Sequence, residues 1–166
     1  MARYYHYLLA LVIALMASTS TASAKDSASG AFLKKAIEGN YAEVQMGKLA
    51  QKNSQRDDVK AFGHTLVHGH GAANQKALDA AEGMNVNPPT GPTAKQQAEY
   101  DRMSKMTGAR FDKMFAPHMV ADHKKDIAEY KNESHAKNAA GEYAATQIPI
   151  LEKHLDTAKS LSSKSK

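Results

Sequence analysis

Four polar side chains fall where a bundle of helices would bury them, one on each of four predicted helices. They are Glu43, His70, His123 and His154, each near the midpoint of its helix. In an up-and-down bundle the midpoints lie at one height, so these side chains should meet in a single layer. One carboxylate and three imidazoles suit zinc, copper, iron or nickel better than magnesium or calcium. We therefore predict a site for one transition-metal ion.

The helical positions of these residues place them on apolar stripes. Glu43 lies one turn before Gly47, and His123 lies one turn after Met119. A buried carboxylate costs on the order of several kcal/mol to desolvate unless it is paired or bound to a cation. The alternative is a structural polar layer, in which Glu43 accepts hydrogen bonds from the histidines and fixes the register of the helices. Asp126, one turn from His123, is expected as a further ligand or as an orienting partner.

The remaining histidines argue against a di-iron centre. Such a centre uses Glu-x-x-His pairs, and none of the eight histidines has a glutamate three residues earlier. His64 and His68 lie one turn apart on the polar face of their helix, where we expect them to be solvated. Met119 would favour copper if its sulfur turned inward, but we expect it to be a core residue.

The elements that would position this layer are all helices. Helix-forming residues are frequent and β-branched runs are missing. The stretch 86–93 holds three prolines and a glycine, so it is a connector. Pro117 and Pro149 should bend their helices without ending them, because the apolar period continues past both. We predict an all-α, four-helix bundle with one extra short helix before the third long one, over residues 31–53, 57–83, 94–106, 109–133 and 138–161.

The start of the chain predicts export. Residues 1–24 read as a signal peptide, with Arg3, an apolar run over 8–17 and small residues before the cleavage site. We expect a polar leader over 25–30, one bundle domain over 31–161 and a frayed tail over 162–166. The predicted location is the periplasm or the exterior, with peripheral outer-membrane association as an alternative and no span in the mature chain. The absence of cysteine excludes disulfides.

Composition excludes several classes of function. The formal charge is +5, but no basic stripe interleaves with aromatic residues and tryptophan is absent, so we expect no nucleic-acid partner. A cysteine nucleophile, a G-x-S-x-G elbow and a phosphate-binding glycine loop are all missing. These observations favour a protein that is not an enzyme.

Several segments together resemble an exported, ferritin-like bacterial family of unknown function, domain of unknown function 4142, whose members are often labelled outer-membrane proteins. They are AFLKKAIEGNYAEVQMGKLAQKNSQRDDVKAFGHTLVHGH, MSKMTGARFDKMF, MVADHKKDIAEY and TQIPILEKHLDTAK. The resemblance implies a ferritin-like bundle with inward residues at Glu43, His70, His123 and His154, and it implies no reaction. The chain departs from the family at VHGHG, where acidic residues usually precede the histidine.

The sequence is consistent with three hypotheses about function. The first is a periplasmic metal-binding bundle for metal handling or stress protection. The second is a non-enzymatic, envelope-associated bundle with a polar core layer. The third is a redox enzyme with a mononuclear metal centre, for which the sequence reveals no substrate pocket.

Overall fold

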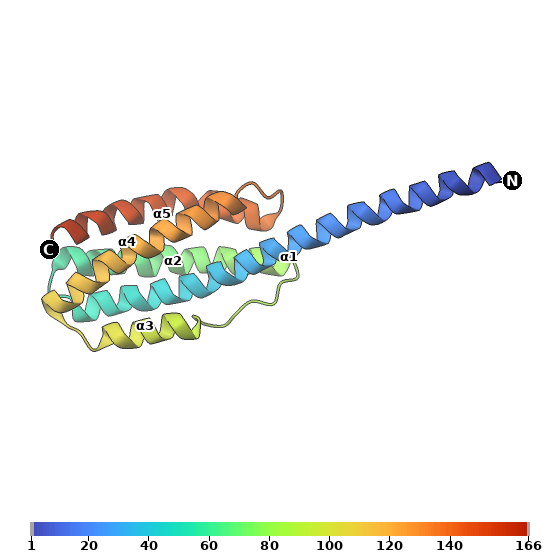
Figure 1. Ribbon diagram of the computed structural model, residues 1–166. Coiled ribbons are helices and arrows are strands. Elements are labelled where there is room, and N and C mark those ends of the chain that lie inside the picture. The colour runs from blue at the N-terminus through green and yellow to red at the C-terminus, as the bar shows by residue number, and fades with distance from the viewer. Residues whose placement is uncertain (1, 166) are drawn as a thin grey trace.

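The protein is an all-α bundle, as the sequence predicts. The computed structural model describes the backbone of residues 2–165 and the side chains of residues 27–165. Within that part of the chain there are five helices and no strands (Figure 1), namely α1 (Ala2–Asn53), α2 (Asp57–Gly83), α3 (Ala94–Ser104), α4 (Gly108–Glu133) and α5 (Ala139–Ser163).

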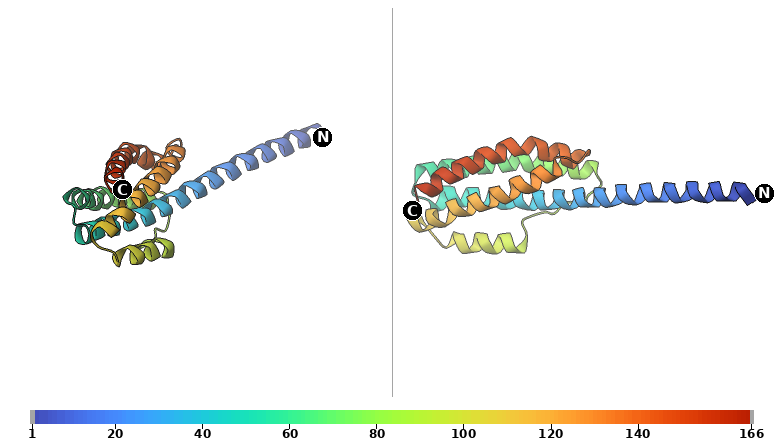
Figure 2. Two further views of the ribbon diagram at one scale, coloured as in Figure 1. Left: turned by 60° about the vertical axis from the view of Figure 1, so that its left-hand side comes forward. Right: turned by 45° about the horizontal axis from the view of Figure 1, so that its top comes forward.

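Four long helices form the bundle, and the short helix α3 lies on its outside. Helix α1 packs mainly on α2, and α4 packs mainly on α5 (Figures 1 and 2). The connector after α2 and then α3 itself run back along the outside of the bundle. Helix α4 therefore begins at the end of the bundle opposite to the one where α2 ends. The predicted extra helix before the third long helix is thus confirmed.

Helix α1 begins much earlier than the sequence indicates. We expected a leader over 25–30 and a helix from about residue 31, but α1 starts at Ala2, and its N-terminal part projects beyond the bundle (Figure 2). The end of the expected leader is held by the bundle. The hydroxyl of Ser29 is buried, donates to Glu133 Oε1 at 2.5 Å and accepts from Asn138 Nδ2 at 3.0 Å.

The predicted signal peptide lies outside the residues whose side chains are described, and its cleavage stays a prediction. The predicted tail starts later than expected, because α5 continues to Ser163 and the Ser165 hydroxyl donates to the Leu161 carbonyl at 2.9 Å. Lys166 lies outside the described residues. Between residues 27 and 165, no helix has both the length and the apolar character that a membrane span requires.

Short polar signals set the helix boundaries. Thr93 and Gln96 form a reciprocal capping box at the start of α3, and the side chain of Asn138 accepts the Gly141 N–H at the start of α5. Helices α4 and α5 continue through Pro117 and Pro149, as the apolar period predicts.

Two glycines bring α1 and α2 into backbone contact. A Cβ atom added at Gly47 would lie 2.6 Å from the carbonyl oxygen of Gly63, and one added at Gly63 would lie 2.5 Å from the carbonyl oxygen of Gly47. Real side chains do not approach so closely, so this crossing requires glycine on both helices.

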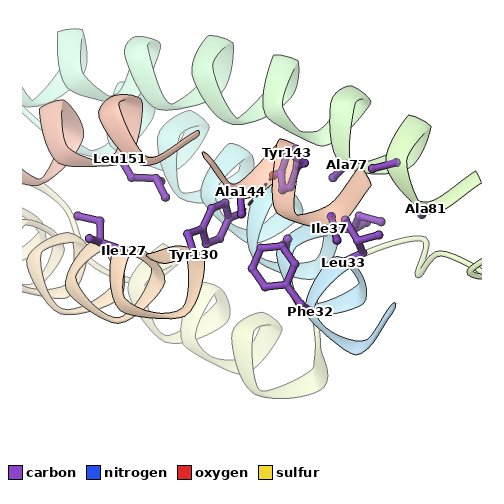
Figure 3. Close-up of a cluster of buried hydrophobic side chains, with 13 residues drawn as sticks. Phe32, Leu33, Ile37, Ala77, Ala81, Ile127, Tyr130, Tyr143, Ala144 and Leu151 are labelled. Atoms are coloured by element: carbon purple, nitrogen blue, oxygen red, sulfur yellow. Dashed lines mark hydrogen bonds between the residues drawn. The ribbon is translucent and has the colours of Figure 1, made fainter. Parts of the chain in front are cut away.

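The core consists of two apolar clusters. One cluster includes Phe32, Leu33 and Ile37 of α1 with Tyr130 of α4 and Tyr143 of α5 (Figure 3). The other includes Met46, Phe62, Phe111, Phe115 and Met119. On every long helix a buried polar residue lies between the positions that enter the two clusters, namely Glu43, His70, His123 and His154. A polar layer therefore separates the two halves of the core.

Candidate metal centre

Three histidines from three helices meet in the polar layer. His70 of α2, His123 of α4 and His154 of α5 are all buried, and one ligating nitrogen from each ring lies within 4.8 Å of the other two. The ring centroids form a near-equilateral triangle, with separations of 5.6 Å, 5.2 Å and 5.4 Å. The convergence of these three residues, predicted from their helical positions, is confirmed. An ion held between them would have three imidazole ligands.

Two of the three rings have a fixed proton position. His70 Nδ1 lies 2.9 Å from Asn40 Oδ1, and His123 Nδ1 lies 2.9 Å from the carbonyl oxygen of Met119. Both partners are carbonyl oxygens that only accept, so each Nδ1 carries the hydrogen and each Nε2 keeps a free lone pair. Metal-bound imidazoles are usually oriented in this way by an acceptor on the far nitrogen.

The nitrogens that remain have no partner in the protein. His70 Nε2, His123 Nε2 and His154 Nδ1 are buried, and none of them has a hydrogen-bond partner among the described residues. Buried polar atoms are nearly always hydrogen-bonded in native structures. Three unpartnered nitrogens on three converging rings could serve as ligands for a metal ion.

His154 reaches the layer because α2 has a glycine opposite it. A Cβ atom added at Gly69 would lie 2.9 Å from Cε1 and 3.2 Å from Nε2 of His154. The ring therefore packs where any other residue at position 69 would place its side chain. The absence of a side chain at Gly69 thus leaves the space on α2 that the His154 ring occupies.

The electrostatics of the layer keep the imidazoles neutral. Burial lowers the pKa of His70 well below its ordinary value, and the nearby rings of His123 and His154 lower it further. Burial also lowers the pKa of His123, although the Met119 carbonyl opposes part of that change. For His154, burial and the His123 ring lower the pKa to about 4. Neutral imidazoles are the form that binds metals.

Glu43 lies beside the histidines but faces a different part of them. Its Oε1 is 3.8 Å from Nδ1 of His123, the nitrogen that donates to Met119, and its Oε2 is buried without a partner. Burial raises the pKa of Glu43 well above its ordinary value, and the charges of Asp122 and Asp126 raise it further. Glu43 is thus buried beside His123, but the cluster of atoms within 4.8 Å of one another contains the three histidines without it, and its role as a ligand stays a prediction.

Asp126 also stays a prediction as an orienting partner. Its side chain is 27 % exposed, and its closest cation is Lys125, with Nζ 3.9 Å from Oδ1. Burial raises the pKa of Asp126 to about 7, against the opposing effect of Lys125. This carboxyl group lies at the edge of the layer.

The outer histidines do not join the centre. His64 and His68 are exposed on α2, with their Nε2 atoms 3.2 Å apart. His118 pairs with Asp122, with Nε2 and Oδ2 separated by 3.1 Å. Met119 is fully buried in the second apolar cluster, and its carbonyl contacts His123, as expected for a core residue.

Sequence reasoning missed the residues that support the histidines. Asn40 lies on the same stripe of α1 as Glu43, three residues earlier, and that spacing could have identified it. Its Nδ2 donates to the hydroxyl of Tyr143 at 3.1 Å, and the Tyr143 hydroxyl lies 3.1 Å from that of Tyr130. A buried chain of hydrogen bonds therefore runs from His70 through Asn40 to the two tyrosines.

Comparison with known proteins identifies the family of this chain. The family model described as "Domain of unknown function (DUF4142)" matches residues 14–161, nearly the whole chain. No curated protein and no solved structure gave a significant match. The match covers all three buried histidines and their supporting residues. The chain therefore belongs to the family defined by this domain of unknown function, DUF4142.

Proposed function

We propose that this protein is an exported metal-binding bundle that holds one transition-metal ion between His70, His123 and His154. Its role would be metal handling or stress protection in the periplasm. Two observations carry the proposal: His70, His123 and His154 each bring one ligating atom within 4.8 Å of the other two, and each ring has a buried nitrogen without a hydrogen-bond partner. Imidazole ligation suits zinc, copper, iron or nickel.

A purely structural polar layer explains these atoms less well. Such a layer would be stabilised by hydrogen bonds among its own members, and unsatisfied members make it weaker than an apolar core. Here Glu43 Oε2, His70 Nε2, His123 Nε2 and His154 Nδ1 all lack a partner among the described residues. A metal ion would satisfy the three nitrogens at once.

The acceptors behind the rings support the same proposal. Asn40 and the Met119 carbonyl each take the Nδ1 hydrogen and aim the opposite lone pair inward. This arrangement fixes both rings before an ion arrives, so binding costs little further side-chain entropy. The carboxyl group of Glu43, which is buried close to His123, is available to offset the charge of the ion.

Thermal unfolding with and without metal tests the proposal. An ion that binds only the folded chain raises the melting temperature, because the unfolded chain cannot gather three distant histidines. Wild-type protein, His154→Ala and His64→Ala would be melted with zinc, copper, iron or nickel in turn. We expect a metal-dependent rise in wild type and His64→Ala, and its loss in His154→Ala. If no metal shifts the wild-type melt, or if both variants respond alike, the polar layer is structural and the envelope-associated reading takes precedence.

A further inference from the structure

A small cavity adjoins two of the three histidines. Its volume is about 10 Å³, close to the space that one water molecule requires. Its lining includes His70 and His154 and also Ile150, which is exposed. The cavity therefore lies between the histidine layer and the surface of the bundle near α5. Glu43 does not line it.

Polar groups from three helices surround this cavity. They are Asn40 of α1, Tyr130 of α4, and Tyr143 and Gln147 of α5. Figure 3 shows the two tyrosines projecting from α4 and α5 into the interior. The cavity is thus unlike the apolar voids of a core, which stay dry, and has the polar partners that hold a water molecule.

The Tyr130–Tyr143 pair has one hydroxyl hydrogen without an acceptor among the described residues. Tyr143 accepts from Asn40 Nδ2, and one of the two hydroxyl hydrogens lies in the bond between Tyr143 and Tyr130. The other hydroxyl hydrogen has no acceptor among the described residues, whichever tyrosine carries it. Burial raises the pKa of both tyrosines, so both keep their hydrogens at neutral pH.

We infer that this cavity holds one small ligand, which is a water molecule, a hydroxide ion or a fluoride ion. The ligand binds the metal ion beside His70 and His154, and it accepts a hydrogen bond from the Tyr130–Tyr143 pair. The inference rests on the proposed function, since it requires an ion between the histidines. Three protein ligands with one exchangeable position are the arrangement of reactive metal sites, whereas four protein ligands typify closed structural ones. The class of ligand is water, hydroxide or a monatomic anion, because the cavity has no room for more.

Copper-loaded protein provides the test, with the His64→Ala/His68→Ala variant used throughout to remove the exposed histidine pair. Electron paramagnetic resonance should show nitrogen coupling from imidazoles, and lines that broaden in ¹⁷O-labelled water. Nitrogen coupling without ¹⁷O broadening would overturn the inference and leave the proposed function standing. Absence of imidazole coupling would instead contradict the proposed function.

Fluoride titration of the same sample tests the tyrosine donor. The Tyr130→Phe/Tyr143→Phe double variant should bind fluoride about tenfold more weakly, the loss expected for one hydrogen bond to a charged acceptor. Each single variant should lose much less, because the remaining hydroxyl hydrogen becomes free to donate. Tyr100→Phe, at a partly buried tyrosine of the second cluster, is the matched control and should bind fluoride as wild type does. Equal fluoride affinity in the double variant and the control would refute the donor assignment, and the ¹⁷O result does not depend on these variants.

Discussion

Gly69 and His154 occupy complementary space across the α2–α5 contact. A Cβ atom built at position 69 would lie only 2.9 Å from Cε1 of the His154 imidazole. Because the His154 ring packs directly against the backbone of α2, its position depends on the absence of a side chain at Gly69. The relationship links the packing of two helices directly to the geometry of the candidate metal centre.

Gly69→Ala should therefore displace the His154 ring and weaken metal binding. We expect a loss of affinity of about tenfold, comparable to the disturbance of a ligand's support in other metal sites. Gly71→Ala is the matched control, because a Cβ atom there meets nothing within 4 Å. Calorimetric titration with the ion that wild type binds would compare the two. Equal affinities would mean that Gly69 does not seat His154.

Asn40 should matter for metal affinity as well as for stability. Asn40→Ala removes the acceptor from His70 Nδ1, so the ring loses its fixed orientation and we expect metal affinity to fall about 10- to 100-fold. Asn53→Ala is the control. Asn53 is another buried α1 asparagine, and its Nδ2 donates to the carbonyls of Ser104 and Met106 far from the centre. Asn53→Ala should lower the melting temperature and leave the metal affinity unchanged. A variant Asn40→Ala with wild-type metal affinity, or a loss of affinity in Asn53→Ala, would contradict the role of Asn40.

The pH dependence of stability should reveal the neutral histidines in the metal-free protein. His154 has a pKa of about 4 when folded and about 6.5 when unfolded, so between these values the unfolded chain binds one more proton. Its contribution to the free energy of unfolding is therefore complete above about pH 6.5 and falls by roughly 3 kcal/mol on going to pH 4. Asp126, whose folded pKa is raised to about 7, changes stability in the opposite direction.

Comparison with a variant isolates the histidine contribution. Urea unfolding of wild type and His154→Gln between pH 7 and 4 should give a shallower fall for the variant, while the effect of Asp126 cancels. His64→Gln, at an exposed ring, should keep the wild-type profile. Parallel profiles for wild type and His154→Gln would show that His154 is not held neutral in the fold.

The crossing of α1 and α2 should tolerate no side chain. Gly63→Ala would place a Cβ atom 2.5 Å from the carbonyl oxygen of Gly47, so we expect a loss of about 1–3 kcal/mol in the free energy of unfolding. Gly39→Ala, in the same bundle and with nothing within 4 Å of the new Cβ atom, should instead stabilise by about 0.5–1 kcal/mol. Chemical denaturation measures both, and a neutral Gly63→Ala would argue against this close packing.

The helical period alone predicts much of the bundle, but it underestimates the buried face of α1. The helical period of α2 places Val59, Phe62 and Leu66 on one face, and all three are buried. In α1 the same period places Phe32 and Ala36 on one narrow stripe, but residues beside it, such as Leu33, Ile37, Met46 and Leu49, are buried as well. Helix α1 contacts every other helix, including α3, and a single helix's pattern contains no information on how many neighbours it will have.

The candidate site, too, could be predicted only in part from the sequence. Periodicity and matching heights predict that His70, His123 and His154 meet, because those properties belong to each helix separately. The atom that Glu43 faces, the bond from His70 to Asn40 and the space under His154 depend on how each helix is rotated against its neighbours. That rotation follows from packing across the bundle, which one sequence does not specify.

Elemental analysis tests the central claim most directly. The protein would be purified without chelators and without a histidine tag, in wild-type form and as His123→Ala, with His68→Ala as the control. We predict about one equivalent of a single transition metal in wild type and in His68→Ala, and almost none in His123→Ala, because the ion needs all three imidazoles. A wild-type protein free of metal, or equal metal content in His123→Ala, would contradict the proposed metal centre.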